Sequence, residues 1–154
     1  MLPPFQAFLD EHKDAVYRFL VASVGAGEVD DCFQETFIAA LRAYATLNES
    51  SSLRAWILKI AQRKAIDAHR SRARRPHPHD VVPEDGRISG PPEPEAPVWG
   101  AVRALPAKQR SAVVQRYIND LPYKEIGDII GCSEEAARQN VRAGLRRLRE
   151  VMGG

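Results

Sequence analysis

Arginine, glutamine and glutamate side chains recur at helical spacing near the end of the 154-residue chain, after Ser133. Arginine bonds guanine through two hydrogen bonds, glutamine bonds adenine in the same way, and glutamate accepts a hydrogen bond from cytosine. This combination predicts contacts with the base edges and phosphates of DNA. The candidate residues, with Arg146 assigned to phosphate, are Lys124, Glu135, Arg138, Gln139, Arg142 and Arg146.

The segments around Ser133 predict a helix-turn-helix that would position these side chains. Residues 123–130 form a short helix with one apolar face, Gly131 leads a tight turn, and Ser133 is a suitable N-cap for a helix over residues 134–151. Glycine suits the turn because its backbone adopts positive φ without steric cost. The second helix of such a motif enters the major groove with its N-terminal residues nearest the bases. The alternative is a solvated basic helix in an ordinary bundle, and the paired helix and turn argue against it.

A second basic surface is predicted on a helix that begins near Ser51 or Ser52 and ends at about Arg72. At about 100° per residue, one narrow stripe of this helix carries an aromatic ring and three cations. The stripe consists of Trp56, Lys59, Arg63 and Arg70. Ring stacking and phosphate contacts suit single-stranded or distorted DNA. A core position for Trp56 and solvated cations are the alternative, which the residues alone leave open.

An acidic face is predicted on the helix that follows Glu28. Its polar side carries Asp30, Asp31, Gln34 and Glu35. The apolar side that we expect to be buried consists of Val29, Phe33, Thr36, Phe37, Ala40, Leu41 and Tyr44. Carboxylates near a helix N-terminus are stabilised by the helix dipole, which is a sufficient structural reason for some of them. A docking surface for a basic partner is the other interpretation, and both stay open at this point.

Prolines and acidic residues separate two helical blocks. Residues 76–97 contain seven prolines and have a net charge of −4. Because proline blocks helices and like charges repel, we expect a flexible acidic linker without stable secondary structure. Residues 1–75, with a net charge of +2, and residues 98–154, with +4, are expected to form two small all-α domains that reorient independently.

Composition narrows the class of protein further. With 44% apolar and 27% charged residues, a soluble globular protein is expected. No apolar run approaches the roughly 18 residues of a membrane span, and no signal peptide is recognised, so we expect a cytoplasmic protein without membrane insertion. Cys32 and Cys132 are expected to be reduced thiols in the core. No catalytic pair or metal-ligand cluster is recognised, so an enzyme, a metal and a cofactor are not expected.

Three motifs follow one another in a specific order. They read E-V-D-D-C-F-Q-E-T-F at residues 28–37, L-R-A-W-I-L-K-I-A-Q-R-K-A-I-D at 53–67, and, in the second half, A-L-P-A-K-Q-R at 104–110, L-P-Y-K-E-I-G at 121–127 and G-C-S at 131–133. The series resembles the extracytoplasmic-function sigma factors, which are small alternative sigma subunits of bacterial RNA polymerase. The resemblance covers about residues 5–75 and 98–151.

The resemblance implies a role for each block. Residues 1–75 would be a region 2 domain, in which Asp30, Asp31, Gln34 and Glu35 bind the clamp helices of the polymerase β′ subunit. Residues 98–154 would be a region 4 helix-turn-helix domain that binds the −35 element as duplex. The residues that would read and melt the −10 element are Asn48, Glu49, Ser50, Trp56, Lys59, Arg63 and Arg70.

The implied partners are core RNA polymerase, through its β′ and β subunits, and promoter DNA in duplex and melted form. The linker would run toward the polymerase active centre and RNA exit path. Whether an anti-sigma protein also binds is left open.

Several residues depart from the pattern of the family. Arg63 stands where asparagine is common, Lys64 where an apolar residue is common, and Glu135-Ala136-Ala137 where Gly-Thr-Val is frequent. These departures leave the promoter sequence open. A stand-alone helix-turn-helix repressor or activator is the alternative function, but it would leave the first block without a role.

Overall fold

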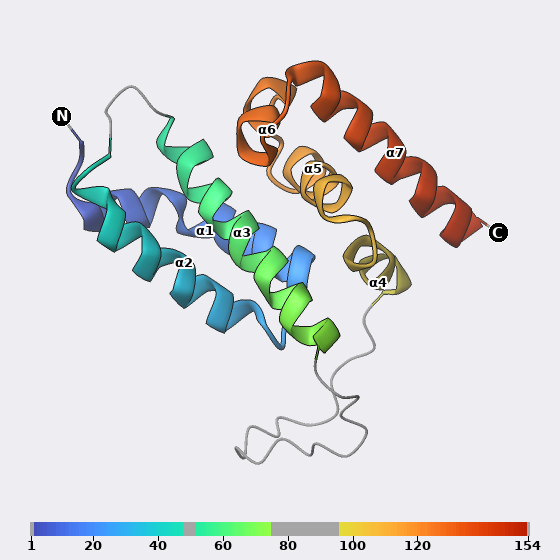
Figure 1. The fold of residues 1–154 in the computed structure, drawn as a ribbon, viewed down its shortest axis with the longest axis horizontal. Coiled ribbons are helices and arrows are strands. Elements are labelled where there is room, and N and C mark those ends of the chain that lie inside the picture. The colour runs from blue at the N-terminus through green and yellow to red at the C-terminus, as the bar shows by residue number, and fades with distance from the viewer. Residues whose placement is uncertain (1, 48–51, 75–95, 154) are drawn as a thin grey trace, which may run out of the picture.

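The computed structural model describes residues 2–47, 52–74 and 96–153, and this part of the chain consists of helices without a strand (Figure 1). In chain order the helices are α1 (Phe5–Val24), α2 (Val29–Tyr44), α3 (Leu53–Arg74), α4 (Pro97–Arg103), α5 (Ala107–Tyr117), α6 (Tyr123–Ile130) and α7 (Glu134–Gly153). The predicted all-α fold is confirmed for the described residues. Asn48, Glu49, Ser50 and the linker up to residue 95 lie outside them.

Helices α1, α2 and α3 form a three-helix bundle. Gly25 ends α1 with a φ of 85°, and the Ser52 hydroxyl caps α3 by accepting a hydrogen bond from the Ala55 amide at 3.3 Å. The apolar faces meet in a core whose largest fully buried side chains are Phe8, Val16, Phe19, Leu20, Val29, Ile57 and Leu58. Burial of these apolar side chains is the main stabilising contribution to the bundle.

The apolar side of α2 is only partly buried, which corrects one sequence-based expectation. Leu41 is 58% exposed and its neighbour Ile38 is 49% exposed, whereas Phe37 and Ala40 are buried. Helix α2 packs mainly on α1 and α3, so apolar residues at the edge of its inner face remain in contact with solvent.

Helices α4 to α7 form a second group that is tightly packed. The buried Arg110 guanidinium donates to the backbone oxygens of Arg103, at 3.3 Å, and Leu105, at 3.0 Å, and so joins α5 to the end of α4. Helix α7 crosses α5 at Gly144, where an added Cβ would lie 2.6 Å from Val113 Cγ2. The crossing therefore requires the smallest residue.

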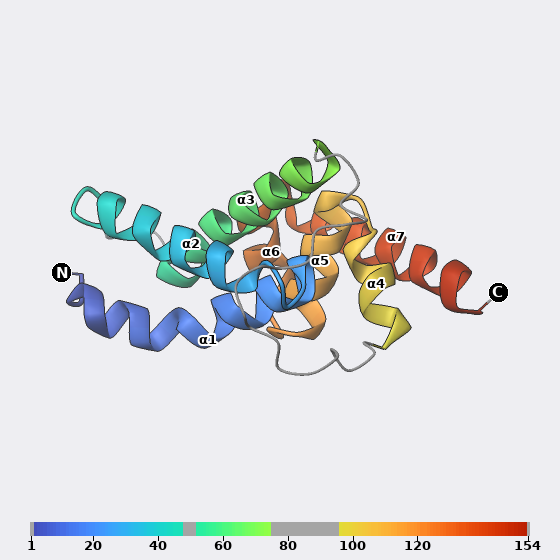
Figure 2. The same ribbon diagram turned by 90° about the horizontal axis from the view of Figure 1, so that it is seen from below.

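The two helical groups also pack against each other. Helix α3 contacts α6, and α1 contacts α4 and α5, as the two views of Figures 1 and 2 show. Asn119, in the segment between α5 and α6, donates to the backbone oxygen of Ala15 in α1 at 3.1 Å. The sequence did not predict this contact between the blocks, and their independent reorientation stays a prediction. A polar residue such as Asn119 gives no sign in the sequence that it will bond another helix.

Candidate nucleic-acid interface

The turn between α6 and α7 has the geometry of a helix-turn-helix. Gly131 adopts the left-handed conformation, with φ 78° and ψ 41°, and its amide donates to the Gly127 oxygen at 2.8 Å. The Ser133 hydroxyl accepts a hydrogen bond from the Ala136 amide at 3.0 Å and so caps α7 as predicted. An added Cβ on Gly127 would lie 2.6 Å from the Cys132 backbone oxygen. The tight turn thus uses two glycines, of which only Gly131 was recognised in the sequence.

Helix α7 presents a polar face outward over its first three turns. The inner face of α7 is buried and includes Ala137, Val141 and Gly144. Among the predicted contact residues on this helix, Arg138 is half-buried and the others are exposed: Glu135, Gln139, Arg142 and Arg146. Lys124 is exposed on α6. The helix-turn-helix therefore brings the predicted −35 residues to one side of the second helical group.

Glu135 connects two of the predicted base-reading side chains. Its carboxylate accepts from Arg138 Nη1 at 2.7 Å and from Gln139 Nε2 at 3.0 Å. The hydrogen bonds from Gln139 and Arg138 lower the pKa of Glu135, which is therefore charged at neutral pH. The Arg138 guanidinium also lies 4.8 Å from the centre of the Tyr123 ring. Before any DNA contact, Arg138 and Gln139 are thus held in a defined arrangement.

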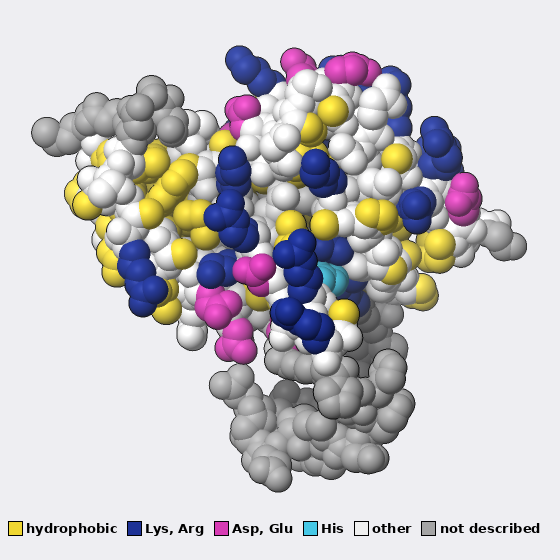
Figure 3. Space-filling model, viewed as in Figure 1, with side chains coloured by type: hydrophobic (Ala, Val, Ile, Leu, Met, Phe, Trp, Pro, Cys, Tyr) yellow, Lys and Arg dark blue, Asp and Glu magenta, His cyan; other side chains and the backbone are white. Residues whose placement is uncertain are grey.

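The basic stripe of α3 is open to solvent on one side. Lys59, Arg63 and Arg70 are exposed, and Figure 3 shows Lys and Arg side chains gathered over α3. Trp56 is partly buried, with its ring centre 5.7 Å from Phe8 and 6.3 Å from Tyr44. Part of the indole therefore belongs to the aromatic core, and only its remaining edge could reach a base.

The far side of the same stripe faces the second helical group. Beside the contact between α3 and α6 lies a hollow of about 210 Å³. It is lined on the α3 side by Lys59, Gln62, Arg63 and Ile66 and on the α6 side by Ile129, Ile130 and Gly131. Helix α6 thus lies directly beside the cations that are proposed to bind DNA.

The acidic face of α2 is exposed as predicted, and apolar side chains share it. Asp30, Asp31, Gln34 and Glu35 are exposed, and Ile38 follows Gln34 at a spacing of four residues. Leu41 was expected in the core because apolar residues on the inner side of an amphipathic helix are assigned to it by default, and Ile38 was not assigned to either face.

Cys32 lies behind this acidic face. Burial, followed by the nearby carboxylates of Glu28, Glu35 and Asp31, raises the pKa of Cys32 to about 11. The side chain therefore stays a neutral thiol, in agreement with the core position expected from the sequence. Cys132, in the turn before α7, is only half-buried.

Within residues 2–47, 52–74 and 96–153, no three His, Cys, Asp or Glu side chains are grouped as metal ligands would be. A search over the same residues found no helix with the length and apolar character needed to cross a membrane.

Fold and site together define a DNA-binding protein of two helical parts, one of them a helix-turn-helix. Comparison with known families matches Sigma-70 region 2 to residues 8–75 and Sigma-70 region 4 to residues 101–150. The chain belongs to the sigma-70 family, and the relatives that it matches include extracytoplasmic-function (ECF) sigma factors. It is therefore an alternative sigma factor of RNA polymerase, acting in transcription initiation, and the stand-alone repressor or activator is not supported.

Individual relatives agree with this membership. The chain is 28% identical to the ECF RNA polymerase sigma factor SigE of Mycolicibacterium smegmatis, over 98% of this chain and 62% of that protein. It is 30% identical to the RNA polymerase sigma-H factor of Pseudomonas aeruginosa, over 75% of this chain and 68% of that protein. The sigma factor RpoE, solved in complex with the anti-sigma factor NepR from Bartonella quintana, has the same fold, with a TM-score of 0.72 and 22% identity over 97% of this chain and 96% of that one.

Proposed function

We propose that this sigma factor binds the −35 element as duplex through α7, and reads and melts the −10 element with α3. The observation that carries the proposal is the helix-turn-helix whose second helix keeps a polar, largely exposed face over three turns. A helix of this kind fits the major groove, where each base pair presents a distinct set of donors and acceptors.

The −35 contacts divide into two kinds. Arg138, Gln139 and Arg142 lie in the N-terminal half of α7 and have the donors to bond base edges. Arg146 is two turns beyond Arg138 and would meet phosphate, as would Lys124 on α6. The first kind sets sequence preference, and the second adds affinity that depends on salt.

The −10 contacts come from the stripe on α3. Lys59, Arg63 and Arg70 would bind the phosphates of the melted strand, and the exposed edge of Trp56 would stack on a base. By the family pattern, a flipped base would be held near residues 48–50. Extraction of a base generally costs a few kcal/mol, which the contacts along α3 would offset.

Polymerase docking is proposed for α2. The face formed by Asp30, Asp31, Gln34 and Glu35 continues into the exposed apolar side chains of Ile38 and Leu41. Apolar residues surrounded by charges are typical of a protein interface, in which the apolar part supplies affinity and the charges supply selectivity. The clamp helices of the β′ subunit are the proposed partner, with the β subunit as a further contact for the second helical group. An anti-sigma partner stays a prediction, and the cytoplasm, where polymerase acts, is the proposed location.

Substitution of Arg63 tests the −10 assignment. Arg63→Ala should slow promoter opening about tenfold or more while core polymerase binding stays unchanged, because Arg63 is proposed to contact the DNA and not the polymerase. Permanganate footprinting of the melted bubble measures opening, and co-purification with core polymerase measures binding. Arg72→Ala is the matched control, since Arg72 is exposed on the same helix but outside the stripe. Opening at the wild-type rate in Arg63→Ala would remove α3 as the −10 reader.

A further inference from the structure

The N-terminal half of α7 has no net charge, whereas its C-terminal half is positive. In the first turns, which are proposed to face the bases, two carboxylates offset two guanidinium groups: Glu134, Glu135, Arg138 and Arg142. Over the last turns three arginines are offset by a single glutamate: Arg146, Arg147, Arg149 and Glu150. Attraction to phosphates is therefore concentrated in the half of the helix that lies away from the bases.

Glu135 holds Arg138 more closely than Glu134 does. Arg138 Nη1 donates to Glu135 Oε2 at 2.7 Å, whereas Arg138 Nη2 lies 3.7 Å from Glu134 Oε1. The other oxygen of Glu135, Oε1, accepts from Gln139 Nε2 at 3.0 Å. Both oxygens of this carboxylate are thus bonded to side chains that are proposed to read base edges.

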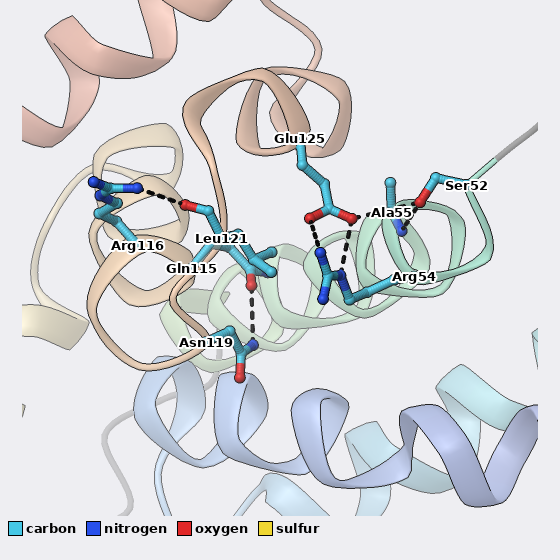
Figure 4. Close-up of polar contacts among 8 residues, drawn as sticks. All are labelled: Ser52, Arg54, Ala55, Gln115, Arg116, Asn119, Leu121 and Glu125. Carbon is cyan, nitrogen blue, oxygen red and sulfur yellow. Dashed lines mark hydrogen bonds and ion pairs between the residues drawn. The ribbon is translucent and has the colours of Figure 1, made fainter.

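Tyr123 of α6 restricts the same guanidinium group. Arg138 Cζ lies 4.8 Å from the centre of the Tyr123 ring, and Arg116 Cζ of α5 lies 4.3 Å from it. Arg116 Nη1 also donates to the Leu121 oxygen at 3.0 Å, as Figure 4 shows. Because the ring attracts cations, it and the Glu135 carboxylate together limit the positions that Arg138 adopts before DNA is bound.

Helix α6, which carries this ring, is itself held in place. Arg54 Nε of α3 donates to Glu125 Oε1 at 2.9 Å, and Arg54 Nη2 donates to Oε2 at 2.7 Å (Figure 4). Glu125 follows Tyr123 by two residues, and its side chain is only 11% exposed. Two parallel bonds between planar groups fix orientation as well as distance, so the ring beside Arg138 has a defined position.

Arg138 keeps enough donors to read a base while it stays bound to Glu135. The guanidinium group has several N–H donors, and Glu135 Oε2 accepts from Nη1 alone. Guanine presents two uncharged acceptors, O6 and N7, in the major groove. A phosphate is an anion, so contact with it would bring a second negative charge next to the Glu135 carboxylate, which is unfavourable. The pair therefore favours guanine over phosphate as the partner of Arg138.

We propose that Glu135 is a specificity-determining residue of the −35 interface, which acts through Arg138 by suppressing the contact of this arginine with phosphate and so directing it to guanine. The inference rests on the proposed binding of duplex DNA by α7. Glu135 stands where glycine is frequent in the family pattern, and a glycine has no carboxylate to restrain a neighbouring arginine. Removal of the carboxylate should strengthen binding at unmatched sites more than at matched ones.

The test compares Glu135→Gln with Glu134→Gln, a control that makes the same charge change one residue away, at the more distant carboxylate. Each variant is assembled with core polymerase, and the holoenzyme is titrated with two promoter duplexes that share one −10 element. One duplex carries a −35 sequence that the wild type selects from a randomised library, and the other carries a scrambled −35 sequence. The ratio of the two dissociation constants measures discrimination.

We expect Glu135→Gln to reduce this ratio about fivefold or more, mainly through tighter binding of the scrambled duplex, and the control to stay within about twofold of the wild type. On the scrambled duplex, the released Arg138 should neutralise one further phosphate, so the salt slope should increase by about 0.9. On the selected duplex the slope should stay unchanged. Because Glu135 is exposed and the Ser133 cap is retained, α7 should stay folded, and a loss of helix would weaken both duplexes together.

A double-mutant cycle shows whether Glu135 acts through Arg138. In a protein that already carries Arg138→Ala, Glu135→Gln should cause no further change in discrimination, because the arginine that the carboxylate restrains is gone. An equal effect of Glu135→Gln with and without Arg138 would mean that the carboxylate acts on DNA directly, and would overturn the inference. Unchanged discrimination in Glu135→Gln, or the same change in Glu134→Gln, would also overturn it.

Failure of the proposed function has a different signature. If the wild-type holoenzyme selects no −35 sequence, α7 does not read the duplex, and the role of Glu135 is refuted together with that function. If the wild type discriminates and Glu135→Gln discriminates equally well, the reading of the −35 element by α7 stands and the role of Glu135 alone is refuted.

Discussion

Replacing Arg138 with alanine should change which −35 sequences the protein selects, whereas Arg146→Ala should weaken all of them by a similar factor. Arg138 lies near the N-terminus of α7, where a helix in the major groove meets the bases, and Arg146 lies two turns further along. A base contact carries sequence information and a phosphate contact does not. The two substitutions therefore separate the two kinds of contact on one helix.

The magnitude follows from what Arg138 gains on the base and what it gives up. A good bidentate contact contributes about 1–3 kcal/mol of discrimination. In the free protein, the guanidinium already bonds Glu135 at 2.7 Å and lies over the Tyr123 ring. The exposed ion pair and the cation–π contact are both weak, and part of each is lost when the guanidinium turns to a base. We expect a net loss of about 1–2 kcal/mol of preference at one position, or roughly five- to thirtyfold.

Transcription from a promoter library randomised across the −35 element, at two salt concentrations, measures both effects. Arg138→Ala should relax preference at one position, and Gln139→Ala should do so at a neighbouring one. Arg146→Ala should leave the preferred sequence unchanged and reduce the salt slope by about 0.9, the value for one phosphate contact. Arg149→Ala, on the exposed side of the last turns of α7, is the control for loss of positive charge. An unchanged preference in both Arg138→Ala and Gln139→Ala would mean that another part of α7 faces the groove.

Three further predictions concern stability and docking. Gly144→Val should destabilise the second helical group by about 1–3 kcal/mol, because its side chain overlaps Val113, and Val113→Ala should restore part of the loss in urea denaturation. Burial lowers the pKa of His12 below 6.5, so the folded state favours the neutral ring. The stability that this preference contributes is complete above pH 6.5 and is lost as the pH falls through the lowered pKa of the folded state. The melting temperature of His12→Phe should therefore decrease less between pH 7.5 and pH 5 than that of the wild type. Reversing the charges of Asp31 and Glu35 together should weaken core polymerase binding about tenfold or more without changing the circular dichroism spectrum, and an unchanged affinity would remove α2 as the docking helix.

The helices and the turn could be predicted from the sequence because local signals determine them. Ser133 has the side chain of an N-cap, Gly131 permits the left-handed turn, and both are found in those roles. The acidic positions of α2 and the basic positions of α3 follow from helical periodicity, which is a property of neighbouring residues.

Contacts between the two helical groups could not be predicted in this way. Arg54 and Glu125 are 71 residues apart, and each resembles an ordinary surface charge in its own helix. Gly127 was missed because an isolated glycine within a short helix has no signature for the backbone that approaches it. The exposure of Leu41 depends on the number of helices that surround α2, which periodicity does not specify.

The two cysteines differ in chemical reactivity as a consequence of where they lie. A thiol with a pKa of about 11 is almost entirely protonated at neutral pH, so Cys32 should react with maleimides or peroxide very slowly. Cys132 is half-buried in the turn ahead of α7 and is the thiol that a reagent can reach. The wild-type protein therefore offers one site for attaching a fluorophore beside the recognition helix, at which docking onto duplex DNA can be followed without introducing a new cysteine.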